Sequence, residues 1–257
     1  MQPQFMRLTD DQWKVMKQFV NWQRKRKINL RDVMDAILWI TRTGTQWRNL
    51  DSQFPKWRAV YYYFDKWGKN GALEKMNISL NSIERLQLNR APCPSLGLVD
   101  SQSIKLAPMI YEHRGIDGHK RINGRKRHLL VDVLGRIWKT EVHAANIHDS
   151  PGGIPLLKDL ELTMPRLEKI LTDKSYRKTF EQAVRNLDLK FEVPVRNDNI
   201  KGFVVEAKRW VVERTLAWLN YFRRIVIDYE HTPRSAKSFL ILANISMVIW
   251  RINWAEL

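Results

Sequence analysis

Cysteine is almost absent from this sequence of 257 residues. The single cysteine, Cys93, rules out an internal disulfide bond, which fits a protein of a reducing compartment. Long apolar runs are missing as well. The longest one near the C-terminus, residues 239–250, is interrupted by Asn244 and Ser246 and is too short to span a bilayer. Because the N-terminus also lacks the apolar core of a signal peptide, we expect a cytoplasmic protein with no membrane segment.

Acidic residues are far fewer than basic ones. Asp and Glu number 27 against 44 Lys and Arg, which gives a formal net charge of +17. A compact protein with this excess repels itself unless a polyanion shares the charge, so nucleic acid is the first partner to consider. A generically basic protein without such a partner is the alternative. With 44% apolar residues, the chain can form one large domain or two small ones.

Residues 1–90 have the pattern of short helices. Thr9 with Gln12 forms a capping box, a second helix starts near Asn29 and ends at Gly44, and further helices are predicted from about residue 55 and over 73–88. Lys56 and Arg58, near the start of the third helix, would suit a helix-turn-helix-like DNA-binding domain. An ordinary helical bundle with solvated charges is the alternative.

The pattern changes after residues 91–95, a proline-containing segment that indicates a linker. We therefore predict two domains, residues 1–90 and 91–257. Leu134 and Gly135 form a hairpin turn between two of the predicted strands. The predicted strands cover residues 96–104, 126–133, 136–144, 167–172 and 189–195, and the predicted helices cover 150–160, 178–187, 204–224 and 235–250. This order predicts an α/β fold with a mixed five-stranded sheet flanked by helices, as in a ribonuclease-H-like core.

Three carboxylates are candidates for a metal site. Asp100 and Asp173 each end an apolar run typical of a buried strand, where a charge is costly unless it is paired or bound to metal. A lone Asp at such a place is otherwise a strand-end cap or a turn former. Glu213 lies on a predicted helix among arginines, which suits either a surface salt-bridge face or the gripping of phosphate beside a metal.

Other polar residues have weaker claims. Asp149 immediately precedes a predicted helix, so we favour a capping role and keep metal binding as the lesser possibility. Asp132 lies near a turn and is expected to pair with the neighbouring cationic cluster. Five of the six histidines fall between His113 and His148 in no compact zinc pattern, so we interpret them as decoration of a DNA-facing loop.

A basic run extends from His119 to His128. It holds the cationic residues Lys120, Arg121, Arg125, Lys126 and Arg127. Because this run enters a strand predicted to lie beside the strand of Asp100, we expect a loop that grips phosphates near the carboxylates. A solvated charged face is the alternative.

These features together resemble the bacterial insertion-sequence DDE transposases, specifically the insertion sequence four/five group, over nearly the whole chain. The N-terminal motifs are LTDDQW (8–13), RTGTQWRNL (42–50), FPKW (54–57) and YFDKW (63–67). The motifs of the second part are DSQS (100–103), GRKRHLLVD (124–132), ANIHD (145–149), TDKSY (172–176) and RWVVERTLAWL (209–219). Their joint order and spacing is more specific than any one motif.

The resemblance implies roles for single residues. Asp100 and Asp173 match the two family aspartates and Glu213 the catalytic glutamate, with Arg209 at the arginine of the same helix signature. The signature's tyrosine position holds Glu206 here, and its lysine position holds Asn220. Arg223 or Arg224 could replace that lysine in binding DNA, and Arg209 and Arg214 are further candidates for DNA contacts. Ser175 stands where many relatives have glycine.

The resemblance also implies an activity. We expect a bacterial, nucleoid-associated transposase that binds Mg²⁺, with Mn²⁺ as a substitute, through Asp100, Asp173 and Glu213, while Asp149 competes with Asp173 for the second role. Its partners would be the terminal inverted repeats and target DNA, bound by a homodimer. The alternatives are an inactive transposase-derived repressor and a ribonuclease-H-like repair nuclease.

Overall fold

Four helices form the N-terminal part of the protein. The computed structural model describes residues 5–21, 23, 27–194 and 210–256, and the four helices are α1 (Asp10–Met16), α2 (Leu30–Thr43), α3 (Trp57–Lys69) and α4 (Ala72–Gln87). Thr9 and Gln12 make both hydrogen bonds of the predicted capping box. Asn29 caps α2, and Gly44 ends it with a left-handed φ of 73°. These predicted helix boundaries are confirmed.

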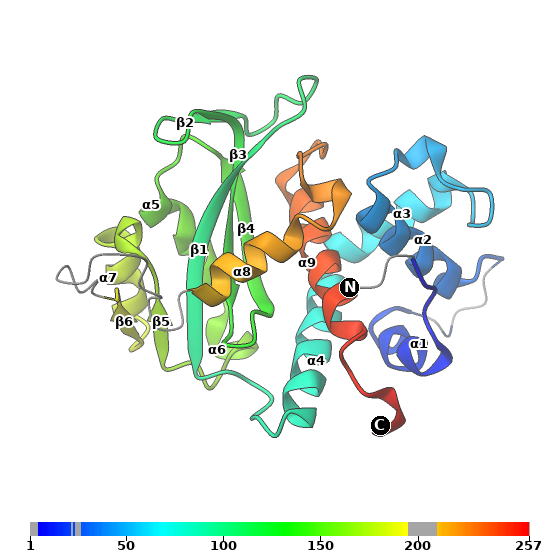
Figure 1. The fold of residues 1–257 in the computed structure, drawn as a ribbon, viewed down its shortest axis with the longest axis horizontal. Helices are drawn as coiled ribbons and strands as arrows, with labels where there is room; N and C mark the ends of the chain where they lie inside the picture. Colours follow the sequence, from blue (N-terminus) through cyan, green and yellow to red (C-terminus); the bar gives the residue numbers. More distant parts are fainter. Residues whose placement is uncertain (1–4, 22, 24–26, 195–209, 257) are drawn as a thin grey trace.

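A mixed sheet forms the second part of the chain (Figure 1). Its strands are β1 (Leu96–Lys105), β2 (Gly115–Asp117), β3 (Ile122–Val131), β4 (Ile137–Ala144), β5 (Lys169–Leu171) and β6 (Lys190–Glu192). The order is β2-β3-β1-β5-β6, and β4 also pairs with β3. β3 is antiparallel to both β1 and β4, whereas β5 is parallel to β1 and β6 to β5. The predicted mixed α/β fold is confirmed, and β2 is a short strand that the sequence pattern did not predict.

Helices cover both faces of this sheet. One face packs against α8 (Trp210–Leu219) and α9 (Pro233–Ile249), and the other packs against α5 (Asp149–Gly153), α6 (Leu160–Thr163) and α7 (Thr179–Arg185). The described residues of this part also form the 3₁₀ turns η3 (Ile154–Leu157), η4 (Lys174–Tyr176), η5 (Arg223–Ile225) and η6 (Trp254–Glu256). The helix predicted over residues 150–160 is instead α5 followed by η3 and then α6, in a stretch that contains two glycines and Pro155. The described part of the helix predicted over 204–224 ends at Leu219.

α9 joins the helical part of the chain to the sheet. Its apolar residues belong to one continuous core with those of α1–α4 and of the sheet face that α8 covers. The amide of Asn244 in α9 donates to the side-chain oxygens of Asn77 and Asn81, and both of these donate to the backbone oxygen of Ile137. The division at residue 91 stays a prediction, but the two segments share a core in this structure.

Two buried ion pairs fasten α4 to the turn between β3 and β4. Arg136 pairs with Glu84, and the guanidinium of Arg85 lies 2.6 Å from the carboxylate of Asp132. Asp132 also accepts from the backbone N–H groups of Leu134 and Arg136, so it closes the hairpin turn. The expectation that Asp132 pairs with the basic run 119–128 was therefore wrong, because its ionic partner comes from α4.

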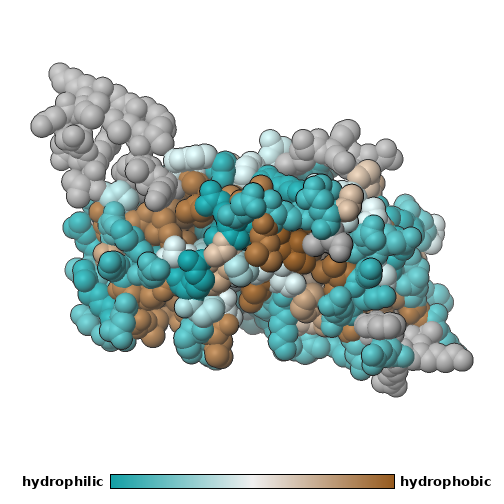
Figure 2. All heavy atoms as spheres, turned by 90° about the horizontal axis from the view of Figure 1, so that it is seen from below, coloured by the Kyte–Doolittle hydropathy of each residue, from teal (hydrophilic) through white to brown (hydrophobic). Residues whose placement is uncertain are grey.

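The surface is mainly hydrophilic on the face that Figure 2 shows, with apolar residues in strips between the charged ones. Among the described residues, no helix has the length and apolar character that crossing a membrane requires.

Candidate functional site

Asp100 and Asp173 each lie two residues beyond a leucine at which two neighbouring parallel strands pair. β1 and β5 pair with Leu96 beside Lys169 and Leu98 beside Leu171, and each aspartate follows its leucine by two residues. Asp173 remains extended and caps η4, where its carboxylate accepts from the backbone N–H of Ser175 at 2.9 Å and from the Ser175 hydroxyl. Asp100 accepts from the backbone N–H of Ser101 at 2.7 Å. Two hard oxygen donors of the kind that Mg²⁺ prefers thus stand at the same edge of the sheet.

Asp100 belongs to the sheet face that α8 covers. Leu98 and Leu171 are part of the same core as Val212 and Leu216 of α8, whereas Val99 belongs to the core on the other face. Since alternate residues of a strand share a face, Asp100 has the side of Leu98. Asp173 lies beyond the end of β5, where it caps η4.

Glu213 is an exposed residue of α8, the helix that covers the face of Asp100. Within the described residues, however, no three His, Cys, Asp or Glu side chains lie close enough together to hold a metal ion. The structure thus brings Asp100 and Asp173 together but does not gather all three carboxylates into one cluster. Arg209 and Glu206 lie outside the described residues.

Asp149 does not cap α5. The cap is His148, whose ring nitrogen accepts from the backbone N–H of Ser150. The Asp149 carboxylate instead accepts from the Ser101 hydroxyl at 2.8 Å and lies 2.9 Å from the ammonium of Lys126. Burial alone would raise the pKa of Asp149, but the contacts with Lys126 and Ser101 outweigh it and lower the pKa. Ser101 adjoins Asp100 on β1, so its side chain points to the opposite face of the sheet.

Tyr176, the last residue of the motif TDKSY, belongs to this site and had no predicted role. Its side chain is fully buried in η4. Burial raises its pKa, and the negative charges of Asp100, Asp149 and Asp173 raise it further. Those carboxylates therefore act together on one buried hydroxyl. The signal in the sequence was an aromatic residue three positions after a candidate metal ligand.

His128 and His143 are buried rather than exposed on a DNA-facing loop. Their Nε2 atoms lie 2.7 Å apart, and the Nδ1 atom of His128 lies 2.5 Å from the hydroxyl oxygen of Tyr176. Burial, followed by the neighbouring His143, lowers the pKa of His128 to about 3, and burial also lowers the pKa of His143. The interpretation of the histidines as loop decoration was wrong for this pair, because β3 and β4 turn both rings inward.

The basic run divides where β3 begins. Lys120 and Arg121 lie exposed at the turn between β2 and β3. Asp117 orders this turn by accepting from the backbone N–H groups of His119 and Lys120, each at 3.0 Å. Burial would raise the pKa of Asp117, but these hydrogen bonds, the Ser103 hydroxyl and Lys126 lower it to about 2. These hydrogen bonds order the turn, and the side chains of Lys120 and Arg121 stay exposed on it.

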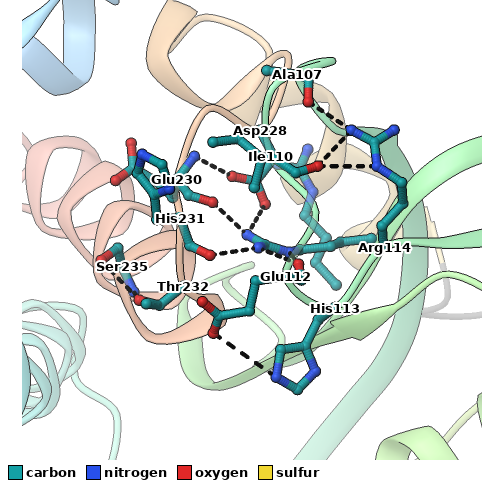
Figure 3. Close-up of polar contacts among 12 residues, drawn as sticks. Ala107, Ile110, Glu112, His113, Arg114, Asp228, Glu230, His231, Thr232 and Ser235 are labelled. Atoms are coloured by element: carbon teal, nitrogen blue, oxygen red, sulfur yellow. Dashed lines mark hydrogen bonds and ion pairs between the residues drawn. The ribbon is translucent and has the colours of Figure 1, made fainter.

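Arg125 is fully buried, so it cannot grip a phosphate as predicted. Its guanidinium lies 3.0 Å from the Asp228 carboxylate and donates to the backbone oxygens of Glu112, Glu230 and His231. Figure 3 shows these acceptors converging from two segments of the chain. Arg125 therefore ties the segment before β2 to the segment before α9.

Lys126 and Arg127 are likewise buried by protein groups. Lys126 lies between Asp149 and Asp117, and Arg127 donates to the side-chain oxygen of Gln102 and to the backbone oxygen of Ile225. Arg224 is also buried and pairs with Glu230 at 2.5 Å. The prediction that Lys126, Arg127 and Arg224 contact DNA was wrong, because acceptor groups of the protein already surround each cation.

The other predicted DNA contacts that lie within the described residues are accessible. Lys56, Arg58 and Arg223 are exposed. The guanidinium groups of Arg58 and Arg48 both lie near the ring of Trp57, at 5.6 Å and 5.9 Å from its centre. Arg214 is partly exposed, with its guanidinium 4.5 Å from the ring centre of Trp210 and of Trp218. These cations leave charge available to a polyanion on α3, on α8 and at η5.

Two family models match the chain. Residues 8–77 match the family described as "putative transposase of IS4/5 family", and residues 91–249, more than half of the chain, match the family described as "transposase DDE domain".

Curated relatives cover part of the chain. A putative transposase for insertion sequence element IS402 of Burkholderia cepacia is 30% identical over 129 residues, which are 46% of this chain and 60% of that protein. The uncharacterized protein y4sN of Sinorhizobium fredii is 36% identical over 73 residues, 27% of this chain and 58% of that protein. The chain thus spans under two thirds of the length of either relative.

A solved structure is similar at a lower level. It is a cryo-electron-microscopy structure of the simian T-cell lymphotropic virus intasome in complex with the PP2A regulatory subunit B56 gamma, 18% identical, with a TM-score of 0.36 over 63% of this chain and 49% of that chain. A TM-score of this size carries no inference about this chain.

Proposed function

Because this chain belongs to the family of transposases with a DDE domain, we propose that it is a DNA transposase that cuts at the ends of an insertion sequence and joins the 3′-hydroxyl to target DNA. A DDE domain implies a ribonuclease-H-like fold, and the mixed sheet with helices on both faces agrees with it. The observation that carries the proposal is the place of Asp100 and Asp173, each two residues beyond a leucine of the paired parallel strands β1 and β5.

The carboxylates are suited to a divalent metal. Burial raises the pKa of Tyr176, and the carboxylates of Asp100, Asp149 and Asp173 raise it further, which supports an accumulation of negative charge around this tyrosine. We assign Asp100 and Asp173 as ligands of Mg²⁺, for which Mn²⁺ can substitute, and Glu213 as the third ligand, since α8 covers the face of Asp100. A bound divalent metal would neutralise charge at the phosphodiester and activate the attacking oxygen.

DNA is the proposed partner, as terminal inverted repeats and as target. The net charge of +17 and the exposed cations on α3 and at the turn between β2 and β3 support phosphate contacts away from the carboxylates. Cutting two ends of one element in concert calls for two copies of the protein, so we propose a homodimer on DNA.

Strand cleavage of a terminal-repeat duplex tests this function. We expect Asp100→Asn, Asp173→Asn and Glu213→Gln each to lower cleavage in Mg²⁺ by at least about a thousandfold, while DNA binding by gel shift is retained. Asp149→Asn is the matched control, since its carboxylate already binds Lys126 and Ser101. Loss of cleavage in Asp149→Asn with activity retained in Asp173→Asn would transfer the second role to Asp149.

The same assay separates the alternatives. Binding of the repeats with no cleavage in either metal would identify a repressor. Cleavage of branched or nicked DNA regardless of the repeat sequence would identify a repair nuclease. Either result would reject the transposase.

A further inference from the structure

A chain of buried hydrogen bonds runs from Tyr176 through His128 to His143. The Nδ1 atom of His143 lies 2.8 Å from the backbone oxygen of Ala144. A carbonyl oxygen can only accept, so Nδ1 of His143 carries the proton and its Nε2 accepts when the ring is neutral. The Nε2 atom of His128, 2.7 Å away, must then donate, which leaves the Nδ1 atom of His128 to accept from the Tyr176 hydroxyl at 2.5 Å.

Both rings are held neutral, as this direction requires. Burial is the largest cause of the lowered pKa of each histidine, and proximity of the second ring adds to it for His128. α5 closes over the pair at Gly152, where a Cβ atom would stand 2.3 Å from Nε2 of His143 and 3.0 Å from Nε2 of His128. Only a residue without a side chain leaves room for the two rings there.

This chain of bonds spans the strands of the site. Tyr176 ends the η4 turn that Asp173 begins, while His128 lies on β3 directly opposite Ser101 of β1. Because β1 lies between β3 and β5, the bond from Tyr176 to His128 passes over the strand that carries Asp100. The hydroxyl thereby fastens the turn after β5 to the far side of β1.

We infer that Tyr176 is a positioning residue, which His128 and His143 orient so that the η4 turn holds the Asp173 carboxylate beside Asp100. This inference rests on the proposed function, since positioning matters there for metal binding. It assigns no contact with substrate to Tyr176, whose hydroxyl is buried.

A first experiment needs no metal and no activity. Amide hydrogen exchange at Ser175, whose N–H donates to Asp173, is compared between the wild type and Tyr176→Phe. We expect exchange to become about fivefold faster, the size of effect that losing one ordinary hydrogen bond gives. Tyr62→Phe is the matched control, because it makes the same chemical change at an exposed tyrosine of α3. Nitrogen NMR in the wild type should find the proton on Nε2 of His128 and on Nδ1 of His143.

A second experiment measures Mn²⁺ binding by calorimetry or electron paramagnetic resonance. We expect Tyr176→Phe to weaken Mn²⁺ binding about tenfold, as loss of a supporting contact around a metal site does. Cleavage should recover at saturating Mn²⁺, so the metal requirement rises while the maximal rate is nearly kept. His128→Leu should behave like Tyr176→Phe. His128→Asn should restore part of the affinity, since an amide oxygen can accept the tyrosine proton.

The two experiments distinguish a failure of the positioning inference from a failure of the proposed function. Unchanged Ser175 exchange in Tyr176→Phe, or a proton on Nδ1 of His128, would overturn the positioning inference whatever the metal does. Faster Ser175 exchange together with wild-type Mn²⁺ affinity would overturn its functional part. If the wild type binds Mn²⁺ no better than Asp100→Asn does, the proposed function fails, and faster Ser175 exchange would then support the positioning of Asp173 alone.

Discussion

The two halves of the basic run 119–128 differ in solvent exposure. His119, Lys120 and Arg121 lie exposed on a turn, whereas Arg125, Lys126, Arg127 and His128 are buried in β3. The exposed half costs little to keep charged and can neutralise phosphates. In the buried half, acceptor groups of the protein stabilise the charges of Arg125, Lys126 and Arg127. His128 is neutral instead, because burial lowers its pKa. Cationic residues close together in sequence can thus serve the fold and a polyanion separately.

The largest expected difference between the halves is in stability. Arg125→Ala would leave the Asp228 carboxylate buried without its ionic partner, so we expect a loss of about 3–5 kcal/mol in the free energy of unfolding, measured in urea. Arg121→Ala, the same change at the exposed turn, should cost under about 0.5 kcal/mol. Equal losses in the two variants would remove the distinction between buried and exposed arginines.

A pH titration should give the next largest difference. The pKa of His128 is lowered from 6.5 to about 3 by burial and by His143, so the unfolded chain binds more protons than the folded one between these values. Its contribution to stability is complete above about pH 6.5 and is lost as the pH falls from there toward 3, by up to about 1.4 kcal/mol per pH unit. His128→Asn should make this slope shallower in unfolding measurements at pH 7.5, 6.0 and 5.0, and the part that remains comes from His143, whose pKa burial also lowers.

His119→Asn is the control for that titration, because His119 is exposed in the same run. It should leave the slope unchanged. The loss expected from Asp117 falls at lower pH, since its pKa of about 2 lies below the ordinary value and its stabilisation disappears between about pH 4 and 2. A wild-type slope in His128→Asn would show that the buried histidine is not the source.

The smallest change in stability is expected at the exposed turn, where the effect should appear in DNA binding. Lys120→Gln combined with Arg121→Gln should make the slope of log affinity against log salt shallower by about 1.8, because two phosphate contacts are lost. Stability should change by under about 0.5 kcal/mol. The pair Lys75→Gln and Lys190→Gln removes the same charge at exposed residues of α4 and β6. An identical slope in both pairs would mean that net charge acts, not this turn.

Local signals in the sequence predicted much of the fold. The Thr9 capping box, the Asn29 cap and Gly44 act within a few residues of themselves, so their helix ends could be predicted without knowledge of the rest. The apolar run before Asp100 and the run before Asp173 likewise predicted β1 and β5. The same reasoning failed for Asp149, because a neighbouring helix start suggested a cap while Ser101 and Lys126, far away in the chain, hold its carboxylate.

The sequence by itself determined the helical first part, the mixed sheet and the two aspartates that follow apolar runs, since each depends on neighbouring residues and on the alternation of side chains along a strand. Only the tertiary structure decided that β1 and β5 pair at the leucines before these aspartates, that Tyr176 contacts two buried histidines, and which cations remain exposed. Such contacts join residues up to about a hundred positions apart, as Arg125 and Asp228 are. Their desolvation and pairing energies exist only after the strands and helices have packed.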